Sequence, residues 1–242
     1  MDIFYTKPFS FFYDKIVKNE HFRYLRFNDG ELNAIDGSRP NAGNCDGHQY
    51  FPEMGKELLE ILLKYGYSDD NIIESFDYWY KNLGLVRNTI DKLKIMNPNL
   101  VLLNTDFIRI AHEQDSDKYI ELLNVLKEKN VVVVGPAYLR ELNRFFSFRY
   151  IEVPIKNCYL EKDRIITEMK AISDNESDVF FLISASMGAN IIIDKFDDDR
   201  NTYLNWGSTW DTFFVSPEYS FIKKRSTSNN EIIRTEYKDY LI

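Results

Sequence analysis

The sequence predicts an α/β fold, a Rossmann-like sandwich with a mostly parallel sheet and helices on both faces. Short apolar runs without polar alternation recur along the chain, at FRYLRF (22–27), NLVLLN (99–104), NVVVVG (130–135), RYIEVP (149–154), DVFFLIS (178–184) and TYLNW (202–206). Stretches of helical character lie between the later runs, over 105–128, 136–146, 158–173 and 186–196. Strands that are apolar throughout are buried on both faces, as in parallel sheets covered by helices.

The first third of the chain is organised differently. Helices are predicted over 9–20, 53–66 and 70–82. The segment 36–52 is rich in Gly, Asn and Asp and is long for a connection, which is typical of a mobile or a binding loop. We therefore expect one domain over 1–242, with 36–82 as an insertion of loop and helices and about 222–242 as a C-terminal arm.

The composition excludes several classes of protein. The net charge is −8, and no basic stretch of the sequence offsets this acidic excess, which argues against a nucleic-acid partner. No run approaches the roughly 18 apolar residues of a membrane span. Two cysteines, Cys45 and Cys158, are too few for a disulfide framework or a cysteine-based zinc site. We expect a reduced, cytoplasmic protein.

The ends of the predicted strands supply the site candidates, because ligands of open parallel sheets bind beyond the carboxyl ends of the strands. Polar, small or acidic residues follow each strand: Asn28, Asp29 and Glu31; Asn104, Thr105 and Asp106; Gly135 and Pro136; Asn157 and Cys158; SASMGAN (184–190); and WGSTWD (206–211).

The D-x-E pair of Asp29 and Glu31 has two explanations. In an extended segment, residues two apart point to the same side, so both carboxylates can aim at one hard cation such as Mg²⁺ or Mn²⁺. Alternatively, NDG is a plain turn and Glu31 is an acid favoured by the amino end of a helix. Taken alone, the pair fits the turn and cap more often than the metal site.

Two glycine-containing segments also have two explanations. The backbone N–H groups of SASMGAN can receive a phosphate where this loop enters a helix, and Gly135 allows a close backbone approach. Neither the dinucleotide fingerprint nor the lysine of a P-loop is present. Close strand-to-helix packing, with Ser184 or Ser186 as a cap, explains the same residues.

Acid–base candidates come from two loops. His48 and Asp46 lie in the polar loop, whereas His112 fits a packed position on a helix and His21 precedes a strand. Asp211 ends GSTWD near two tryptophans, whose rings suit sugars or bases but are more often core.

Together these motifs resemble the GT-D-fold glycosyltransferases. The resemblance covers about residues 22–215 and is carried by RFNDGE, NCDGHQYFPEMGKELLEIL, VVVVGPAYLREL, IEVPIKNC, FFLISASMGANIIID and LNWGSTWD in this order. It implies a Rossmann-like fold and a glycosyltransferase (hexosyltransferase) that takes a nucleotide-diphosphate sugar, with a UDP-sugar as the expected donor. Its acceptor is a glycan or glycoconjugate, and a homodimer is left open.

The resemblance also implies roles for single residues. Asp29 and Glu31 match the metal-binding D-x-E, for Mn²⁺ or Mg²⁺. The residues expected to bind the nucleotide sugar are Arg26, Asn104, Gly135, Pro136, Asn157, Ser184, Ser186, Met187, Gly188 and Asn190. Asn205 and Trp206 stand where the family commonly has an Asp and an aliphatic residue, so a role of that aspartate does not carry over.

The expected chemistry needs charge neutralisation and, for inversion, a base. A cation on Asp29 and Glu31 would neutralise the leaving diphosphate. Asp211, ahead of Asp46 and His48, is the preferred base for the acceptor hydroxyl, and a retaining reaction would not need one. Two alternatives remain: a metal-dependent phosphohydrolase, and a non-catalytic nucleotide-sugar-binding module.

Overall fold

An eight-stranded sheet forms the centre of the protein in the computed structural model, which describes residues 4–39, 42–44, 46–65, 68–104, 107–108, 115–220, 222 and 228–242. The strands lie in the order β1-β4-β3-β2-β8-β7-β5-β6, and every assigned pair is parallel. Their bounds are β1 Phe4–Tyr5, β2 Arg23–Arg26, β3 Asn71–Glu74, β4 Leu102–Leu103, β5 Asn130–Pro136, β6 Arg149–Val153, β7 Val179–Ile183 and β8 Thr202–Asn205. The predicted fold class is confirmed.

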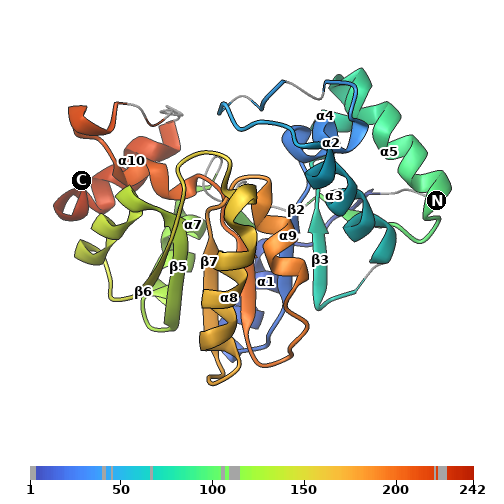
Figure 1. Cartoon of the computed structure of the whole chain (residues 1–242). Helices are drawn as coiled ribbons and strands as arrows, with labels where there is room; N and C mark the ends of the chain where they lie inside the picture. Colours follow the sequence, from blue (N-terminus) through green and yellow to red (C-terminus); the bar gives the residue numbers. More distant parts are fainter. Residues whose placement is uncertain are drawn as a thin grey trace.

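Helices cover both faces of this sheet. The α-helices are α1 Phe9–Lys18, α2 Asp29–Asp36, α3 Pro52–Lys64, α4 Asp77–Asn82, α5 Gly84–Met96, α7 Ser116–Leu126, α8 Lys162–Ser173, α9 Gly188–Asp194 and α10 Ser228–Glu236. The 3₁₀ helices are η1 Ala137–Arg144, η2 Cys158–Glu161, η3 Thr209–Phe213, η4 Pro217–Tyr219 and η5 Lys238–Tyr240. Figure 1 shows α8 and α9 in front of the sheet and α1 behind it.

The apolar strands feed two separate cores. In β7, Phe181 belongs to one core with side chains of α3, α5, α8 and α9, whereas Phe180 and Leu182 belong to the other with side chains of α1 and α7. Val132 and Val133 of β5 divide in the same way. Successive side chains of a strand point to opposite faces, so burial on both faces requires the continuous apolar runs seen in the sequence.

The predicted helix over 70–82 is wrong in its first part. Residues Asn71–Glu74 form β3, which pairs with β2 over four positions, and a helix begins only at Asp77. Two β-branched residues, Ile72 and Ile73, fit a buried strand, and both are nearly fully buried. The segment predicted as an insertion of loop and helices therefore contributes a strand to the sheet.

Smaller differences concern the element bounds. The predicted strand over 99–104 shortens to β4, and the predicted helix over 136–146 is the 3₁₀ helix η1. The strand β1 and the helix α5 were not predicted. Of the predicted helix over 105–128, the structure describes α7, which Asp115 caps by accepting from the Lys118 N–H. Thr105, Asp106, His112 and Cys45 lie outside the described residues.

The C-terminal arm packs on the second core. Ile233 and Tyr237 are buried beside α7 and η3, and the last residue, Ile242, accepts hydrogen bonds from Val215 and Ser216 N–H. Lys127 at the end of α7 has its Nζ 3.9 Å from the centre of the Phe145 ring and 4.8 Å from that of Tyr237. A cation over two rings adds to the apolar contact that holds the arm.

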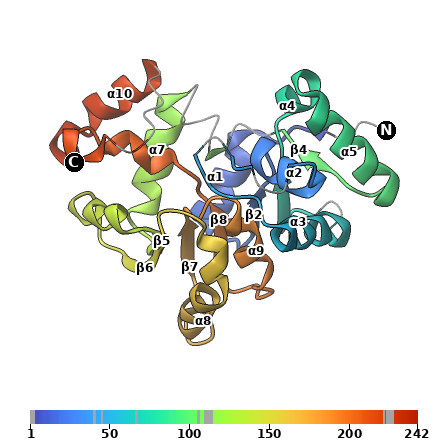
Figure 2. The same ribbon diagram turned by 45° about the horizontal axis from the view of Figure 1, so that its top comes forward.

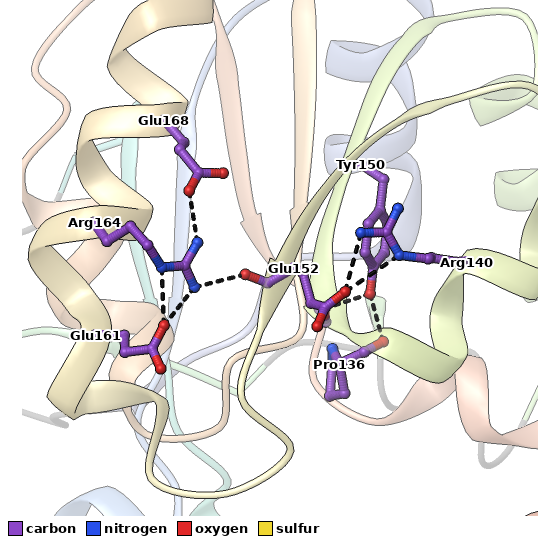
Figure 3. A network of polar contacts seen from close by, with 8 residues as sticks. Pro136, Arg140, Tyr150, Glu152, Glu161, Arg164 and Glu168 are labelled. Carbon is purple, nitrogen blue, oxygen red and sulfur yellow. Dashed lines mark hydrogen bonds and ion pairs between the residues drawn. The ribbon is translucent and has the colours of Figure 1, made fainter.

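A polar network fixes the edge strand β6 beside the end of β5 (Figure 3). The Tyr150 hydroxyl lies 2.5 Å from the backbone oxygens of both Gly135 and Pro136. Arg164 of α8 donates to the backbone oxygen of Glu152, and Arg140 of η1 pairs with the Glu152 side chain. These contacts occupy backbone oxygens at the end of β5 and on the edge strand β6, and they hold the ends of both strands in place.

Candidate active site

A cleft of about 640 Å³ lies at the carboxyl ends of the strands, where the segments that follow β2, β5, β6, β7 and β8 meet. Figure 2 brings forward the upper edge of Figure 1, at which α2 begins. The predicted site residues that line the cleft are Arg26, Asp29, Glu31, Asp46, His48, Pro136, Ser184, Ser186 and Asp211. These residues are up to 185 positions apart in the sequence, from Arg26 to Asp211. They meet because the carboxyl ends of parallel strands lie at the same end of the sheet.

Other predicted residues do not line the cleft: Asn104, Gly135, Asn157, Met187, Gly188 and Asn190. Sequence reasoning also missed four polar lining residues, Asn44, Tyr138, Lys156 and Asn205. A signal for Lys156 existed, because it follows β6 at the same edge as the predicted residues. Tyr138 belongs to η1 and gave no signal of its own.

Asp29 and Glu31 lie on a helix and not in an extended segment. The helix α2 begins at Asp29, so the assumption behind the shared direction of the two carboxylates was wrong. Glu31 is at the third helical position, and its Oε2 accepts from the Asn28 backbone N–H at 3.0 Å. This is the carboxylate half of a capping box. Both side chains nevertheless line the cleft.

Glu31 is the carboxyl group with the most unusual environment in the cleft. Desolvation raises its pKa from 4.5 to about 7, against the opposing effects of backbone hydrogen bonds and of the Arg26 charge. The nearby Asp29 charge raises it further. A carboxyl group in these surroundings is ionised at a free-energy cost that a cation would remove.

The helix α2 is held against its neighbours by close contacts. A Cβ on Gly55 of α3 would lie 2.3 Å from the backbone oxygen of Ala34, so only glycine allows this approach. At the other end of the helix, the buried side chain of Met187 packs against Gly30. Met187 therefore supports the helix that carries the D-x-E pair instead of lining the cleft.

Arg26 is fixed in a buried ion pair beneath the cleft. Its Nε lies 3.5 Å from Oε1 of Glu74, which is 0% exposed, and Tyr24 donates to the other carboxylate oxygen of Glu74. Its Nη1 donates to the backbone oxygen of Trp206 at 3.2 Å. Gly207 makes room for this guanidinium, because its φ is +67° and a Cβ there would lie 2.3 Å from Nη1.

Asn190 joins the ends of two strands and does not reach the cleft. Its Oδ1 accepts from the Arg26 N–H at 3.0 Å and from Asn205 Nδ2 at 2.8 Å, and its Nδ2 donates to the Arg26 backbone oxygen at 2.6 Å. The side chain is fully buried. It acts on the cleft only by fixing β2 beside β8.

The SASMGAN segment divides into lining and packing residues. Ser184 and Ser186 line the cleft, and the Ser184 Oγ is buried without a hydrogen-bond partner within the described part of the chain. Ser186 has a left-handed backbone with φ of +48°. By contrast, the Gly188 N–H is directed to the sulfur of Cys158, and a Cβ on Gly188 would lie 3.0 Å from that sulfur. Gly188 is therefore a packing residue.

Residues 42–44 and 46–50 bring Asp46 and His48 to the cleft. Tyr50 N–H donates to the Ala42 oxygen at 3.0 Å, and Asn44 N–H donates to the His48 oxygen at 2.9 Å. Asn44 also accepts at its Oδ1 from the Asp46 and His48 N–H groups. These hydrogen bonds order the segment at the rim of the cleft, although its composition is typical of a loop.

Asp211 lies in η3 and receives a hydrogen bond from a residue of η1. The Tyr138 hydroxyl donates to Asp211 Oδ1 at 2.9 Å. Burial, and then the charge of Asp211, raise the pKa of Tyr138 above its usual range, so the phenol stays protonated as a donor. This bond orients a partly buried carboxylate at the cleft wall.

The described residues offer a hard cation few ligands. No group of three or more His, Cys, Asp or Glu side chains within the described ranges is arranged to hold a metal ion. Asp29 and Glu31 line one cleft and fit a Mg²⁺ or Mn²⁺ site in which waters and substrate phosphates complete the coordination shell. The raised pKa of the Glu31 carboxyl is consistent with this use.

Comparison with solved structures identifies the architecture. A structure of the highly conserved domain of unknown function 1792 (DUF1792), described as a distinct glycosyltransferase fold, aligns over 99% of this chain and 95% of its own, with a TM-score of 0.60 and 16% identity. A selenomethionine-substituted DUF1792 structure aligns with a TM-score of 0.61 and 16% identity, over 99% of this chain and 95% of its own. A glycosyltransferase (DUF1792) from Streptococcus sanguinis aligns over 94% of this chain and 97% of its own, with 0.60 and 14% identity. The chain has the DUF1792 fold.

The resemblance that the motifs indicated is thereby confirmed for the fold. At 14–16% identity, the DUF1792 structures establish the architecture alone. No family model and no curated protein matches the sequence. Among the described residues, none of the helices has the length and apolar character that crossing a bilayer requires.

Replacing Gly207 by alanine should destabilise the protein. The left-handed backbone and the 2.3 Å approach of Arg26 both oppose a Cβ, so we expect a loss of about 1–3 kcal/mol in the free energy of unfolding, measured in urea. Gly84→Ala is the matched control, because a Cβ there would meet nothing within 4 Å and alanine favours a helix. Equal effects of the two variants would contradict the role assigned to Gly207.

Replacing Glu31 by glutamine should stabilise the metal-free protein at alkaline pH. Glutamine keeps the cap. As pH rises from 4.5 to about 7, the unfolded chain loses a proton that folded Glu31 keeps, so the wild-type protein loses stability over this window. The upper bound is about 3 kcal/mol, and partial exposure lowers it. Urea unfolding with a chelator should show little difference at pH 4.5 and a more stable variant at pH 8; an unchanged difference would contradict the raised pKa.

Proposed function

We propose that this protein is a metal-dependent glycosyltransferase that moves a sugar from a nucleotide-diphosphate sugar, with UDP as the expected nucleotide, to a glycan or glycoconjugate acceptor. The observation that carries the proposal is the set of carboxylates Asp29, Glu31, Asp46 and Asp211 around one cleft, at the strand ends of a fold shared with DUF1792 glycosyltransferases. Oxygen-rich clefts of this kind suit a cation-bound diphosphate.

Asp29 and Glu31 would hold the cation. When bound, Mn²⁺ or Mg²⁺ acts as a Lewis acid that neutralises charge developing on the leaving diphosphate. Glu31 is preorganised for this by its bond to the Asn28 N–H, which fixes the direction of its carboxylate. Burial of the carboxyl group strengthens its attraction to any cation in the cleft.

The same cleft supplies cationic and hydroxyl groups to a diphosphate. Lys156 has an exposed side chain at the rim, whereas Arg26 is committed to Glu74 and contributes mainly a fixed charge. Ser184, with its unpartnered buried Oγ, is a donor to a ligand oxygen. Together with the cation, these groups can stabilise the negative charge of the diphosphate.

Asp211 is the proposed base for the acceptor hydroxyl. The Tyr138 hydrogen bond stabilises the ionised carboxylate and fixes its direction at the wall of the cleft. Asp46 is more exposed and lies on the rim, which makes it the weaker choice.

A thermal-shift panel tests the proposal. UDP-, GDP-, dTDP- and CMP-sugars are added with and without Mn²⁺, and the cognate donor at 100 times its Kd should raise Tm by about 5–10 °C in the presence of metal. Asp29→Asn and Glu31→Gln should abolish the metal-dependent part of the shift, whereas Asp199→Asn on an exposed turn should not. The proposal fails if no nucleotide sugar shifts Tm. It also fails if the variant that carries both Asp29→Asn and Glu31→Gln keeps the metal-dependent part of the shift.

Replacing Asp211 by asparagine should lower kcat. Loss of a general base reduces turnover about 10²–10⁴-fold, while KM for the donor changes little. Sugar transfer to acceptor is measured for Asp211→Asn, for Tyr138→Phe, which should lose less, and for the Asp199→Asn control. Turnover of Asp211→Asn close to that of the wild type would exclude Asp211 as the base.

A further inference from the structure

The His48 imidazole has a tautomer fixed by the backbone. The Asn157 N–H donates to His48 Nδ1 at 3.2 Å. A backbone N–H can only donate, so Nδ1 must present its lone pair, and the neutral ring carries its proton on Nε2. The ring lines the cleft, and among the described residues no hydrogen bond engages Nε2–H, which is therefore the polar group offered to a ligand.

Asn157 holds His48 and Gln49 from a distant part of the chain. Besides its bond to the ring, its Oδ1 accepts from the Gln49 N–H at 2.8 Å. Asn157 has a left-handed backbone with φ of +56°, a conformation that Asn tolerates well. The His48 N–H in turn donates to Asn44 Oδ1 at 2.9 Å, so the ring and its backbone are both held.

The charges around His48 favour the neutral ring. Burial lowers the pKa of His48, and the Lys156 charge lowers it further, while the Asp46 charge opposes both. Lys156 comes from the segment after β6, and Asp46 from the same loop as His48. Protonation of Nδ1 would also break the bond from Asn157.

We propose that His48 is a neutral hydrogen-bond donor that recognises a sugar hydroxyl through Nε2–H, and that it is not the general base. The lone pair that a base needs is on Nδ1 and is already engaged by Asn157. Asp46, two residues away on the same turn, adds a carboxylate acceptor to the cleft lining. A donor beside an acceptor complements hydroxyl groups, which both donate and accept.

The sugar in question belongs to the donor or to the acceptor, and this inference rests on the proposed glycosyltransferase function. The role of His48 differs in size from that of a base. Loss of one neutral hydrogen bond corresponds to roughly a 3- to 10-fold change in affinity. Loss of a general base corresponds to about 10²–10⁴-fold in turnover.

The tautomer is tested without any substrate. A two-bond ¹H–¹⁵N correlation spectrum of the protein labelled at histidine should show the His48 ring neutral at pH 7, with the proton on Nε2. The His48→Phe spectrum assigns the signal among the three histidines. A proton on Nδ1, or a cationic ring at pH 7, overturns the inference whatever the enzyme's activity.

Kinetics then test the role of the donor. His48→Phe should raise KM for one substrate roughly 3- to 10-fold, leave kcat and its pH profile in place, and leave the affinity for UDP alone unchanged. A higher KM for UDP-glucose or UDP-galactose assigns the hydroxyl to the donor sugar, and a higher KM for the acceptor assigns it to the acceptor. His48→Gln, which keeps an N–H donor, should recover part of the loss.

The matched control is His21→Phe, because His21 lies at the opposite ends of the strands, where its ring contacts Thr202 and Asp178. A fall of kcat by 10²-fold or more in His48→Phe contradicts the assignment. KM values of His48→Phe that equal those of the wild-type protein for every substrate contradict it as well. If the wild-type protein binds no nucleotide sugar, the proposed function fails while the tautomer result still stands.

Discussion

The buried contacts at the carboxyl end of β2 hold the rest of the cleft in place. Arg26 is tied to Glu74 of β3 through its side chain and to Asn190 of α9 through its backbone, and Asn190 is tied to Asn205 of β8. A buried charge left without its partner costs about 3–5 kcal/mol, so this arrangement tolerates little change. Because α2 starts three residues after Arg26, the position of the D-x-E pair follows from the same contacts.

Two loops on the rim each hold one residue in a left-handed conformation, at different cost. Asn157 and Ser186 both have left-handed backbones, which the structure maintains through hydrogen bonds to the 42–50 loop, from Gln49 to Asn157 and from Asn44 to Ser186. Asn tolerates this conformation well, whereas a serine in it costs of order 1–3 kcal/mol. The segment held in this way brings Asp46 and His48 to a cleft built mainly by the sheet.

Glu31 makes the capping contact of one explanation of its motif, and it lines the cleft as the other explanation requires. The capping contact that argued against a metal site is present, and it uses one carboxylate oxygen. The carboxyl group is also desolvated, and its raised pKa shows that its charge lacks full compensation in the protein alone. Local pattern alone could not separate the explanations, because both place an acid at the same position of the helix.

The sequence by itself determined the α/β class, the strands β2 and β5 to β8, and the end of the sheet at which the cleft lies, because short apolar runs that alternate with helical stretches are typical of strands buried on both faces. It did not reveal β3, whose four residues read as part of a helix until β2 is placed beside them. Tertiary structure alone decided which polar residues line the cleft and which serve packing. Asn157, Gly188 and Asn190 have the same residue types as ligand-binding positions, and only contacts with residues distant in sequence direct their polar groups elsewhere.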